Sequence, residues 1–181
     1  SAGTPSCVQP INGTVTITVI PLPIVTIISD SIICPNSEAT VTFTGTPNAI
    51  VTYKINNGAD QTITLNTSGT AKITQNYTTT TVYTLVSATI PPLNCSQPQT
   101  GKVTITVLPL PTATIASDAT ICFNQTATVT FTGTPNATVI YKVNGGTDQS
   151  ILLNASGSAT ITKTFVTTTI YSLVSISSGD S

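Results

Sequence analysis

Apolar residues alternate with threonines along much of this chain. In residues 13–19, Val15, Ile17 and Val19 are separated by single threonines. A period of two predicts a β-strand with one buried side and one solvent-facing side. The same criterion predicts further strands at residues 24–28, 40–44, 51–55, 63–65, 71–73, 83–86 and 103–107. No segment has the periodicity of a helix, so the chain is predicted to be all-β.

Turn residues separate these predicted strands about every ten residues. Pro21 and Pro23 end the first strand, because proline cannot donate to a strand ladder. Asn57-Gly58 predicts a tight hairpin, and Asn144-Gly145 repeats this signal in the second copy, since these residue types tolerate a positive φ.

One stretch, TVTFTGTPNA, occurs at residues 40–49 and again at residues 128–137. With an offset of 88 positions, residues 7–88 align with residues 95–176 without a gap, and about 52 of the 82 pairs are identical. The chain is therefore a tandem repeat, and the two copies should share one fold.

Each repeat carries seven predicted strands, a pattern typical of an immunoglobulin-like β-sandwich, with a β-barrel as the alternative fold. Residues 21–108 hold one complete repeat. Residues 1–20 hold the last strand of a preceding repeat, and residues 109–181 form a repeat that lacks its last strand. Short, proline-stiffened links between repeats predict tandem sandwiches arranged as an extended rod.

Two explanations fit this arrangement of strands, and both stay open. The residues can be a window on a longer tandem array. Alternatively, the N-terminal strand of one molecule completes the C-terminal repeat of another molecule by donor-strand addition.

The composition is almost free of charge. Charged residues make up 6% of the chain, the net charge is −1, and His, Met and Trp are absent. A soluble protein has roughly 25% charged residues. Neither nucleic acid nor an anionic membrane is expected as a partner, and no segment approaches the length of a membrane span. A surface covered by Thr, Ser and Asn is common in exported stalks, so we expect an extracellular chain.

No group of residues predicts catalysis. Histidine is absent, and the carboxylates are widely spaced along the sequence. Asp60 and Asp148 recur beside the hairpins, where turn capping is favoured over calcium binding, because Ca²⁺ takes six or more oxygen ligands. The sequence predicts no enzyme activity, no cofactor and no metal site. Tyr83 and Tyr171, near the start of the sixth strand, stand where a tyrosine corner would bond to nearby backbone.

The cysteines recur once before the second strand (Cys34, Cys122) and once after the sixth (Cys7, Cys95). Recurring cysteines in an exported chain predict disulfides. Strand counting places Cys34 and Cys95 at opposite ends of one sandwich, about 23 Å apart. A disulfide needs Cα atoms within roughly 7 Å. We therefore predict disulfides between consecutive repeats, with partners outside this chain.

The order of motifs resembles a known group: Pro-Leu-Pro, Ile-x-Ser-Asp, Ile-Cys, TVTFTGTPNA, Tyr-Lys-x-Asn and Tyr-x-Leu-Val-Ser. It is similar to the tandem Ig-like (PKD-like) repeats of very large cell-surface adhesins of gliding Bacteroidota. The resemblance covers almost the whole chain and implies export by type IX secretion. It also implies O-glycosylation at Ser31 in Asp30-Ser31-Ile32, although the second repeat has Asp118-Ala119 there.

The function that this implies is that of stalk repeats in a filamentous surface adhesin. Such repeats give reach and traction in attachment or gliding, with neighbouring repeats as partners and polysaccharide or a solid substratum as the surface that is gripped. The alternative is that each repeat is itself a carbohydrate-binding or surface-binding module. That function would favour an exposed aromatic cluster, whereas Phe43, Tyr53, Tyr77 and Tyr83 fall at inward positions.

Overall fold

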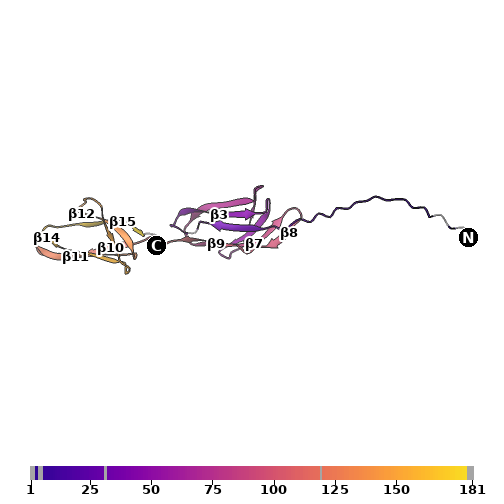
Figure 1. Ribbon diagram of the computed structural model, residues 1–181. Coiled ribbons are helices and arrows are strands. Elements are labelled where there is room, and N and C mark those ends of the chain that lie inside the picture. Colours follow the sequence, from indigo (N-terminus) through magenta and orange to yellow (C-terminus); the bar gives the residue numbers. More distant parts are fainter. Residues whose placement is uncertain (1–2, 4–5, 31, 119, 179–181) are drawn as a thin grey trace. The chain divides into compact units, whose positions relative to one another are not determined.

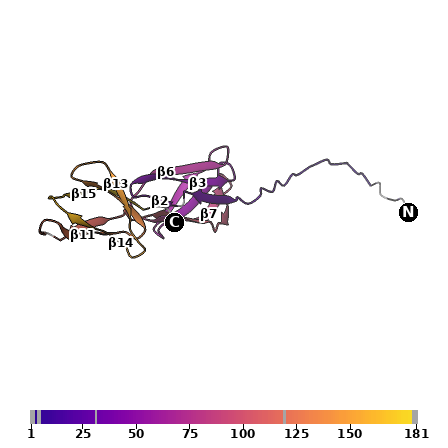
Figure 2. The same ribbon diagram turned by 60° about the vertical axis from the view of Figure 1, so that its left-hand side comes forward.

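The protein is all-β. The computed structural model describes residue 3 and residues 6–30, 32–118 and 120–178. These described residues contain strands in several sheets and no helix. The chain divides into two compact units, Ser1–Leu108 and Pro109–Ser181, which are described separately below (Figures 1 and 2).

The first unit has two sheets. One sheet has the order β1-β3-β6, and the other has the order β2-β9-β7-β4-β5, with β8 paired to β7. All pairs are antiparallel except the parallel pair β2 and β9. The strands are β1 (Val25–Ser29), β2 (Ile32–Ile33), β3 (Ser37–Gly45), β4 (Ile50–Ile55), β5 (Asp60–Thr64), β6 (Thr70–Tyr77), β7 (Thr81–Ile90), β8 (Cys95–Pro98) and β9 (Lys102–Val107).

The inward side chains of these two sheets form one hydrophobic core. Phe43 on β3 packs against Tyr53 on β4, with ring centroids 5.2 Å apart, and Tyr53 stacks on Tyr83 of β7 at 6.0 Å. All three side chains are buried, as is Ile105 on β9. Two sheets that share one core in this way are consistent with a β-sandwich.

The alternation predicted for the repeated stretch is confirmed in β3. Ala39, Val41 and Phe43 are buried, whereas Thr40 lies on the opposite, solvent-facing side. There its hydroxyl lies 3.0 Å from the hydroxyl of Thr74 on β6. Threonine suits this side because its β-branched side chain fits a pleated surface and its hydroxyl stays hydrated.

The end of the repeated stretch is hydrogen-bonded to the residue just before β1. Thr46 N donates to the Ile24 carbonyl (3.0 Å), and Ile24 N donates to the Thr46 hydroxyl (3.1 Å). A side chain on Gly45 would collide with the same carbonyl oxygen, so only glycine fits at this position. These contacts explain why Gly-Thr is kept in both copies of the stretch.

The hairpin between β4 and β5 uses different residues from those predicted. Positive φ angles occur at Asn56 (49°) and Asn57 (58°), and Gly58 N donates to the Ile55 carbonyl at 2.8 Å. The two-residue turn is therefore Asn56-Asn57 and not Asn57-Gly58. Asparagine is enriched among the non-glycine residues that adopt this backbone region, so the turn did not need the glycine and lies one position earlier than predicted.

The first unit also has more strands than the seven predicted. β2 contains only two residues, and it exists because β9 lies beside it and supplies the hydrogen-bonding edge. β8 contains Cys95 and pairs with the end of β7, so Cys95 lies in a strand and not in a loop. Neither strand has an alternating pattern of its own, so periodicity could not reveal them.

The chain enters and leaves the first unit at opposite ends. At one end, Val25 N at the start of β1 donates to the side chain of Gln99, shortly before β9 begins. At the other end, Ile33 pairs with Val107, the last residue of β9. The path from β1 to β2 thus runs in the same direction as β9.

The second unit repeats this framework with fewer strands. Its sheets have the orders β10-β11-β14 and β13-β12-β15. Residues 120–121, the counterparts of β2, form no strand, and the counterparts of β8 and β9 would follow residue 181. The strands are β10 (Ala113–Ser117), β11 (Gln125–Gly133), β12 (Ala137–Val143), β13 (Gln149–Leu152), β14 (Ser158–Phe165) and β15 (Tyr171–Ser178).

The segment before β1 forms no strand within its described residues, 6–24. Figure 1 shows it as an extended ribbon without a neighbouring strand. The side chains of Val15, Ile17 and Val19 are 91%, 85% and 85% exposed. This segment therefore carries an alternating pattern whose apolar side is uncovered.

Replacing Phe43 by alanine should destabilise the first unit by about 3–5 kcal/mol, because it removes a fully buried ring and leaves a cavity. Hydrogen–deuterium exchange measured strand by strand should show faster exchange throughout β1–β9. The strands β10–β15 should keep their protection, because Phe131 supplies the corresponding ring in a separate core.

The matched control is Leu93→Ala, which shortens an exposed apolar side chain of the same unit. It should leave exchange almost unchanged. Equal loss of protection in both units of Phe43→Ala would contradict the separation of the two cores.

Candidate functional site

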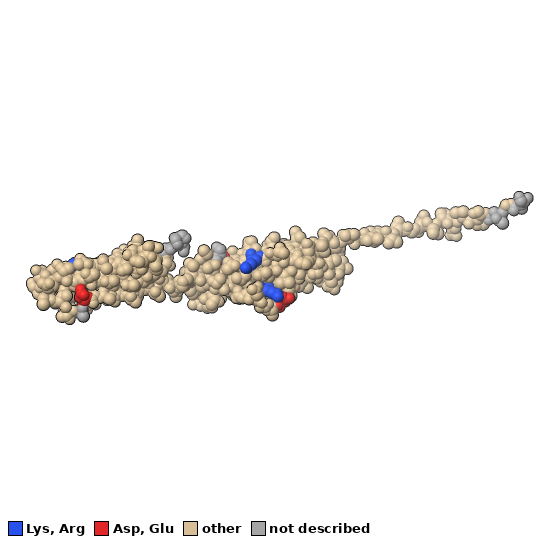
Figure 3. Space-filling model, turned by 90° about the horizontal axis from the view of Figure 1, so that it is seen from below, with Lys and Arg blue, Asp and Glu red and all other residues tan. Residues whose placement is uncertain are grey.

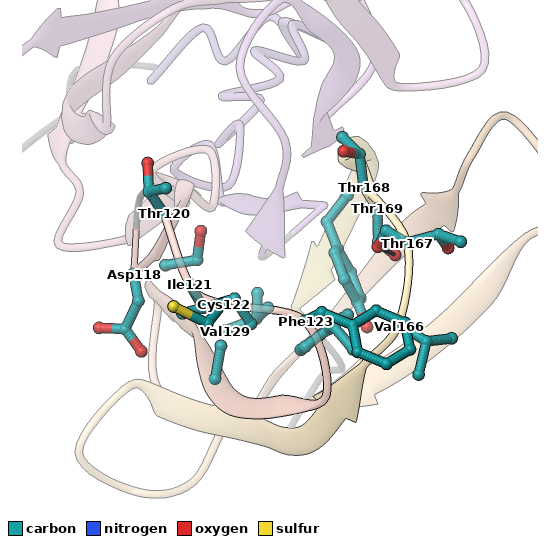
Figure 4. A pocket seen from close by; sticks show the side chains of 14 residues that line it. Asp118, Thr120, Ile121, Cys122, Phe123, Val129, Val166, Thr167, Thr168 and Thr169 are labelled. Carbon is teal, nitrogen blue, oxygen red and sulfur yellow. Dashed lines mark hydrogen bonds between the residues drawn. The ribbon is translucent and has the colours of Figure 1, made fainter.

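The feature of the second unit that stands out is an open groove of about 450 Å³. One side is formed by residues 120–123, which follow β10, and the other by residues 165–169, which precede β15 (Figure 4). Val129 on β11 and Tyr171 on β15 also line it. The groove thus lies where the edges of the two sheets of this unit meet.

The same place in the first unit is filled by β9. There Ile105 is 0% exposed, and β9 pairs with β7 through Thr81–Ile105 and with β2 through Ile33–Val107. In the second unit the counterpart of β9 would follow residue 181, and residues 120–178 place no other strand there. The groove therefore lies at the position that the last strand, β9, occupies in the first unit.

Comparison of equivalent residues shows what the last strand covers. Leu85 on β7 is 3% exposed, whereas its counterpart Leu173 on β15 is 37% exposed. Tyr83 is fully buried, whereas its counterpart Tyr171 is only half-buried. An uncovered apolar surface of this kind is unfavourable in water and favours a partner.

The backbone on the two sides of the groove also forms no strand ladder. Residues 120–121 correspond to β2 but form no strand. β15 begins at Tyr171, whereas β7 begins at Thr81, the counterpart of Thr169. The groove therefore offers two strand edges, and an added strand would satisfy both of them.

The chemistry of the groove is mostly apolar and uncharged. Its lining has one carboxylate, Asp118, and one thiol, Cys122. Asp118 Oδ2 accepts a hydrogen bond from Thr128 N at 3.3 Å, just as Asp30 Oδ2 accepts one from Thr40 N at 2.7 Å in the first unit. The carboxylate is thus part of a recurring loop contact, and the groove suits an uncharged partner with apolar side chains.

The tyrosine hydroxyls in the first unit bond to side chains and not to backbone, so the predicted tyrosine corner is wrong. The Tyr83 hydroxyl lies 3.0 Å from the Tyr77 hydroxyl and accepts a 3.4 Å hydrogen bond from Gln75 Nε2. Burial, and then the hydrogen bond to Tyr77, raise the pKa of Tyr83 far above its usual value. In the second unit Phe165 replaces Tyr77, so this hydroxyl pair is absent from the described residues there.

One exposed aromatic residue of the described chain was not predicted from its sequence pattern. Phe123 stands at the rim of the groove and is 78% exposed. Its counterpart in the first unit is Pro35, so comparison of the repeats gave no signal for an aromatic side chain there. The inward placement expected for Phe43, Tyr53, Tyr77 and Tyr83 is confirmed.

The four cysteines are not joined to one another in the described structure. Cys34 directly follows β2, beside the end of β9, and Cys95 pairs with Ile90 at the far end of β7. Cys7 is exposed, and Cys122 is exposed at the groove. Disulfides with cysteines outside this chain stay a prediction, and Ser31, the expected O-glycosylation site, lies outside the described residues.

The few charged groups do not converge. Lys54 and Asp60 form an exposed ion pair at 3.5 Å, and Lys142 and Asp148 repeat it at the same distance. Asp60 and Asp148 therefore face a lysine beside the hairpin. Among the described residues, no three His, Cys, Asp or Glu side chains are placed to hold a metal ion. Figure 3 shows charged side chains scattered singly or in pairs on an otherwise uncharged surface.

No helix suited to crossing a membrane occurs among the described residues. Neither models of known protein families nor curated protein sequences gave a match to this chain. The groove and the repeat are therefore the features from which a function has to be inferred.

The burial of Tyr83 predicts that the first unit loses stability in alkali. Its folded-state pKa is raised above the unfolded value of 10.0, so the folded state keeps a proton that the unfolded state loses. The contribution is complete below about pH 10 and declines as the pH rises beyond it. Urea unfolding followed by circular dichroism at about pH 8 and about pH 11 should show this fall in the midpoint.

Tyr83→Phe should reduce the fall, because it removes the titrating hydroxyl. Tyr77→Phe is the matched variant. It removes the hydrogen bond but leaves Tyr83 buried, and it should keep most of the fall while costing about 1–3 kcal/mol at neutral pH. An equal fall in Tyr83→Phe and the wild type would rule out Tyr83 as its source.

Proposed function

We propose that this chain consists of structural stalk repeats of a filamentous cell-surface adhesin, exported from the cell, which give reach and traction in surface attachment or gliding. The fold that we propose for each repeat is an immunoglobulin-like sandwich. Its support is the pair of three-stranded and six-stranded sheets in the first unit, whose separate edges do not favour a barrel.

The observation that carries the proposal is that the two units share one framework. β1 pairs with β3 through Val25–Gly45, and β10 pairs with β11 through Ala113–Gly133, which is the same register 88 positions later. The register shift in β4 against β7 recurs in β12 against β15. Near-equal units are what a spacer needs, because its task is length.

The path of the chain supports an end-to-end arrangement. In the first unit the chain enters beside Gln99 and leaves beside Ile33, at opposite ends of the strands. A repeat of this kind adds its full strand length to the filament. We propose an extended rod of such repeats, stapled by disulfides from Cys34 and Cys95 to cysteines of the neighbouring repeats.

The surface also supports a spacer function. With 6% charged residues and few exposed aromatic residues in its described part, the chain offers little for polar or stacking recognition of a sugar. Phe123 is the observation that favours the alternative, a carbohydrate-binding or surface-binding module, because an exposed ring can stack on a sugar face.

Deletion of residues 21–108 from the protein in the cell that makes it should shorten the surface filament by one repeat and weaken attachment under flow. The physical reason is that a spacer contributes length and no specific contact. Filament length is measured by immuno-electron microscopy, and attachment is measured in a flow chamber.

The matched control replaces residues 21–93 by a second copy of residues 109–181, which changes many surface residues but keeps the length. It should restore both filament length and attachment. A swap that restores length but not attachment would favour the binding module, as would reproducible binding of the 181-residue chain to a glycan array.

A further inference from the structure

We propose that the groove of the second unit binds residues 13–20 of a second copy of this chain, so that copies join head to tail by strand addition. This inference goes beyond the proposed function and does not rest on it. The occupant is identified by its sequence, by the register that the first unit displays, and by its uncovered apolar side.

The proposed donor is almost identical to the strand that fills the same place in the first unit. Residues 13–19 read GTVTITV, and residues 101–107 read GKVTITV. The single difference is Thr14 in place of Lys102, which is exposed on β9. Every residue that β9 turns toward the core thus has an identical counterpart in the donor.

Donor and groove each lack what the other supplies. Ile17 is 85% exposed in the described N-terminal segment, whereas its counterpart Ile105 is 0% exposed in the first unit. On the acceptor, Leu173 and Tyr171 are uncovered relative to Leu85 and Tyr83. Insertion of the donor would bury both apolar surfaces at once.

The first unit fixes the register of the proposed pairing. Thr81 pairs with Ile105, which places Ile17 opposite Thr169 of the acceptor. On the other edge, the parallel pair Ile33–Val107 places Val19 beside Ile121. The donor would therefore run between the two edges that the groove leaves open.

The hydrogen bonds of β9 have donors and acceptors at the equivalent positions. Leu108 N donates to the Ile33 carbonyl at 2.9 Å, and the counterparts are Ile20 N and the Ile121 carbonyl. Val107 N donates to the Thr80 hydroxyl at 3.1 Å, and Thr168 supplies the same hydroxyl in the second unit.

Gly13 corresponds to Gly101, a position with little room for a side chain. On Gly101 a Cβ would lie 2.7 Å from Leu85 Cδ1, so a side chain there would have to displace the leucine. Gly101 also accepts a 2.7 Å hydrogen bond from Leu85 N. Glycine at position 13 lets the donor approach Leu173 in the same way.

The match ends before Gly13. Gln99 bonds with its side chain to Val25 N (3.2 Å) and the Pro23 carbonyl (3.0 Å), and its counterpart in the donor is Ile11, which has no such groups. We therefore limit the proposed donor strand to residues 13–20.

The test is the self-association of the 181-residue chain, measured by sedimentation velocity over increasing concentration. We expect dimers and longer species whose proportion rises with concentration. Ile17→Asp should weaken association by about tenfold or more, because it places a carboxylate where Ile105 is buried. The variant lies outside both cores, so it leaves folding intact.

The matched control is Thr16→Asp, which adds the same charge one residue away. Its counterpart Thr104 is exposed on β9, so this variant should associate like the wild type. A chain that stays monomeric overturns the proposal. Equal association of Ile17→Asp and the wild type, or equal loss in both variants, overturns it as well.

A second measurement locates the contact. A synthetic peptide of residues 12–20 should dissociate the oligomers and protect residues 168–173 from hydrogen exchange, and the same peptide with Ile17→Asp should do neither. Protection elsewhere in the chain, or none, would show that the groove takes a different occupant, such as a segment that follows residue 181. These outcomes bear on strand addition and leave the stalk function untouched.

Discussion

The contact on which each repeat depends is the insertion of a last strand between two open edges. In the first unit β9 pairs with β7 on one side and with β2 on the other, and it carries Ile105 into the core. Without such a strand, Leu173 of the second unit is exposed and residues 120–121 form no strand. One strand thus completes both the hydrogen-bonding ladder and the hydrophobic core, so the loss of that strand would leave both incomplete.

A second constraint lies where the chain enters each unit. Thr46 hydrogen-bonds to the backbone of Ile24, which Gly45 closely approaches, and Thr134 and Gly133 stand in the same relation to Thr112. A side chain at either glycine would collide with that backbone. This explains why the longest identical stretch of the two repeats includes this turn.

The alternation of apolar residues with threonine predicted the long strands and the inward aromatic residues, because a strand with one buried face needs an apolar residue at every second position. β2 has no such pattern, since its two residues form a strand only because β9 lies beside them. The hairpin at Asn56-Asn57 was displaced by one position, because asparagine takes a positive φ as glycine does. Tyr77 as the partner of Tyr83 depends on the packing of two strands, which periodicity does not specify.

The vacant place of a last strand was predictable from the offset of 88 positions, whereas Phe123 was not, since its counterpart is Pro35.

Proteins protect exposed strand edges by charges, prolines or covering segments. The donor residues 13–20 carry no charge, and even the lysine of β9 is replaced there by Thr14. A strand of this composition gains from any edge that fits it, and residues 13–19 match residues 101–107 at every position except Thr14. A following repeat in one long chain and a second copy of this chain would make the same contacts, because the interface is the same and only the connectivity differs. Covalent linkage raises the effective concentration of the strand, so a tandem array closes the groove within one chain, and strand addition between chains requires a sufficient concentration of copies.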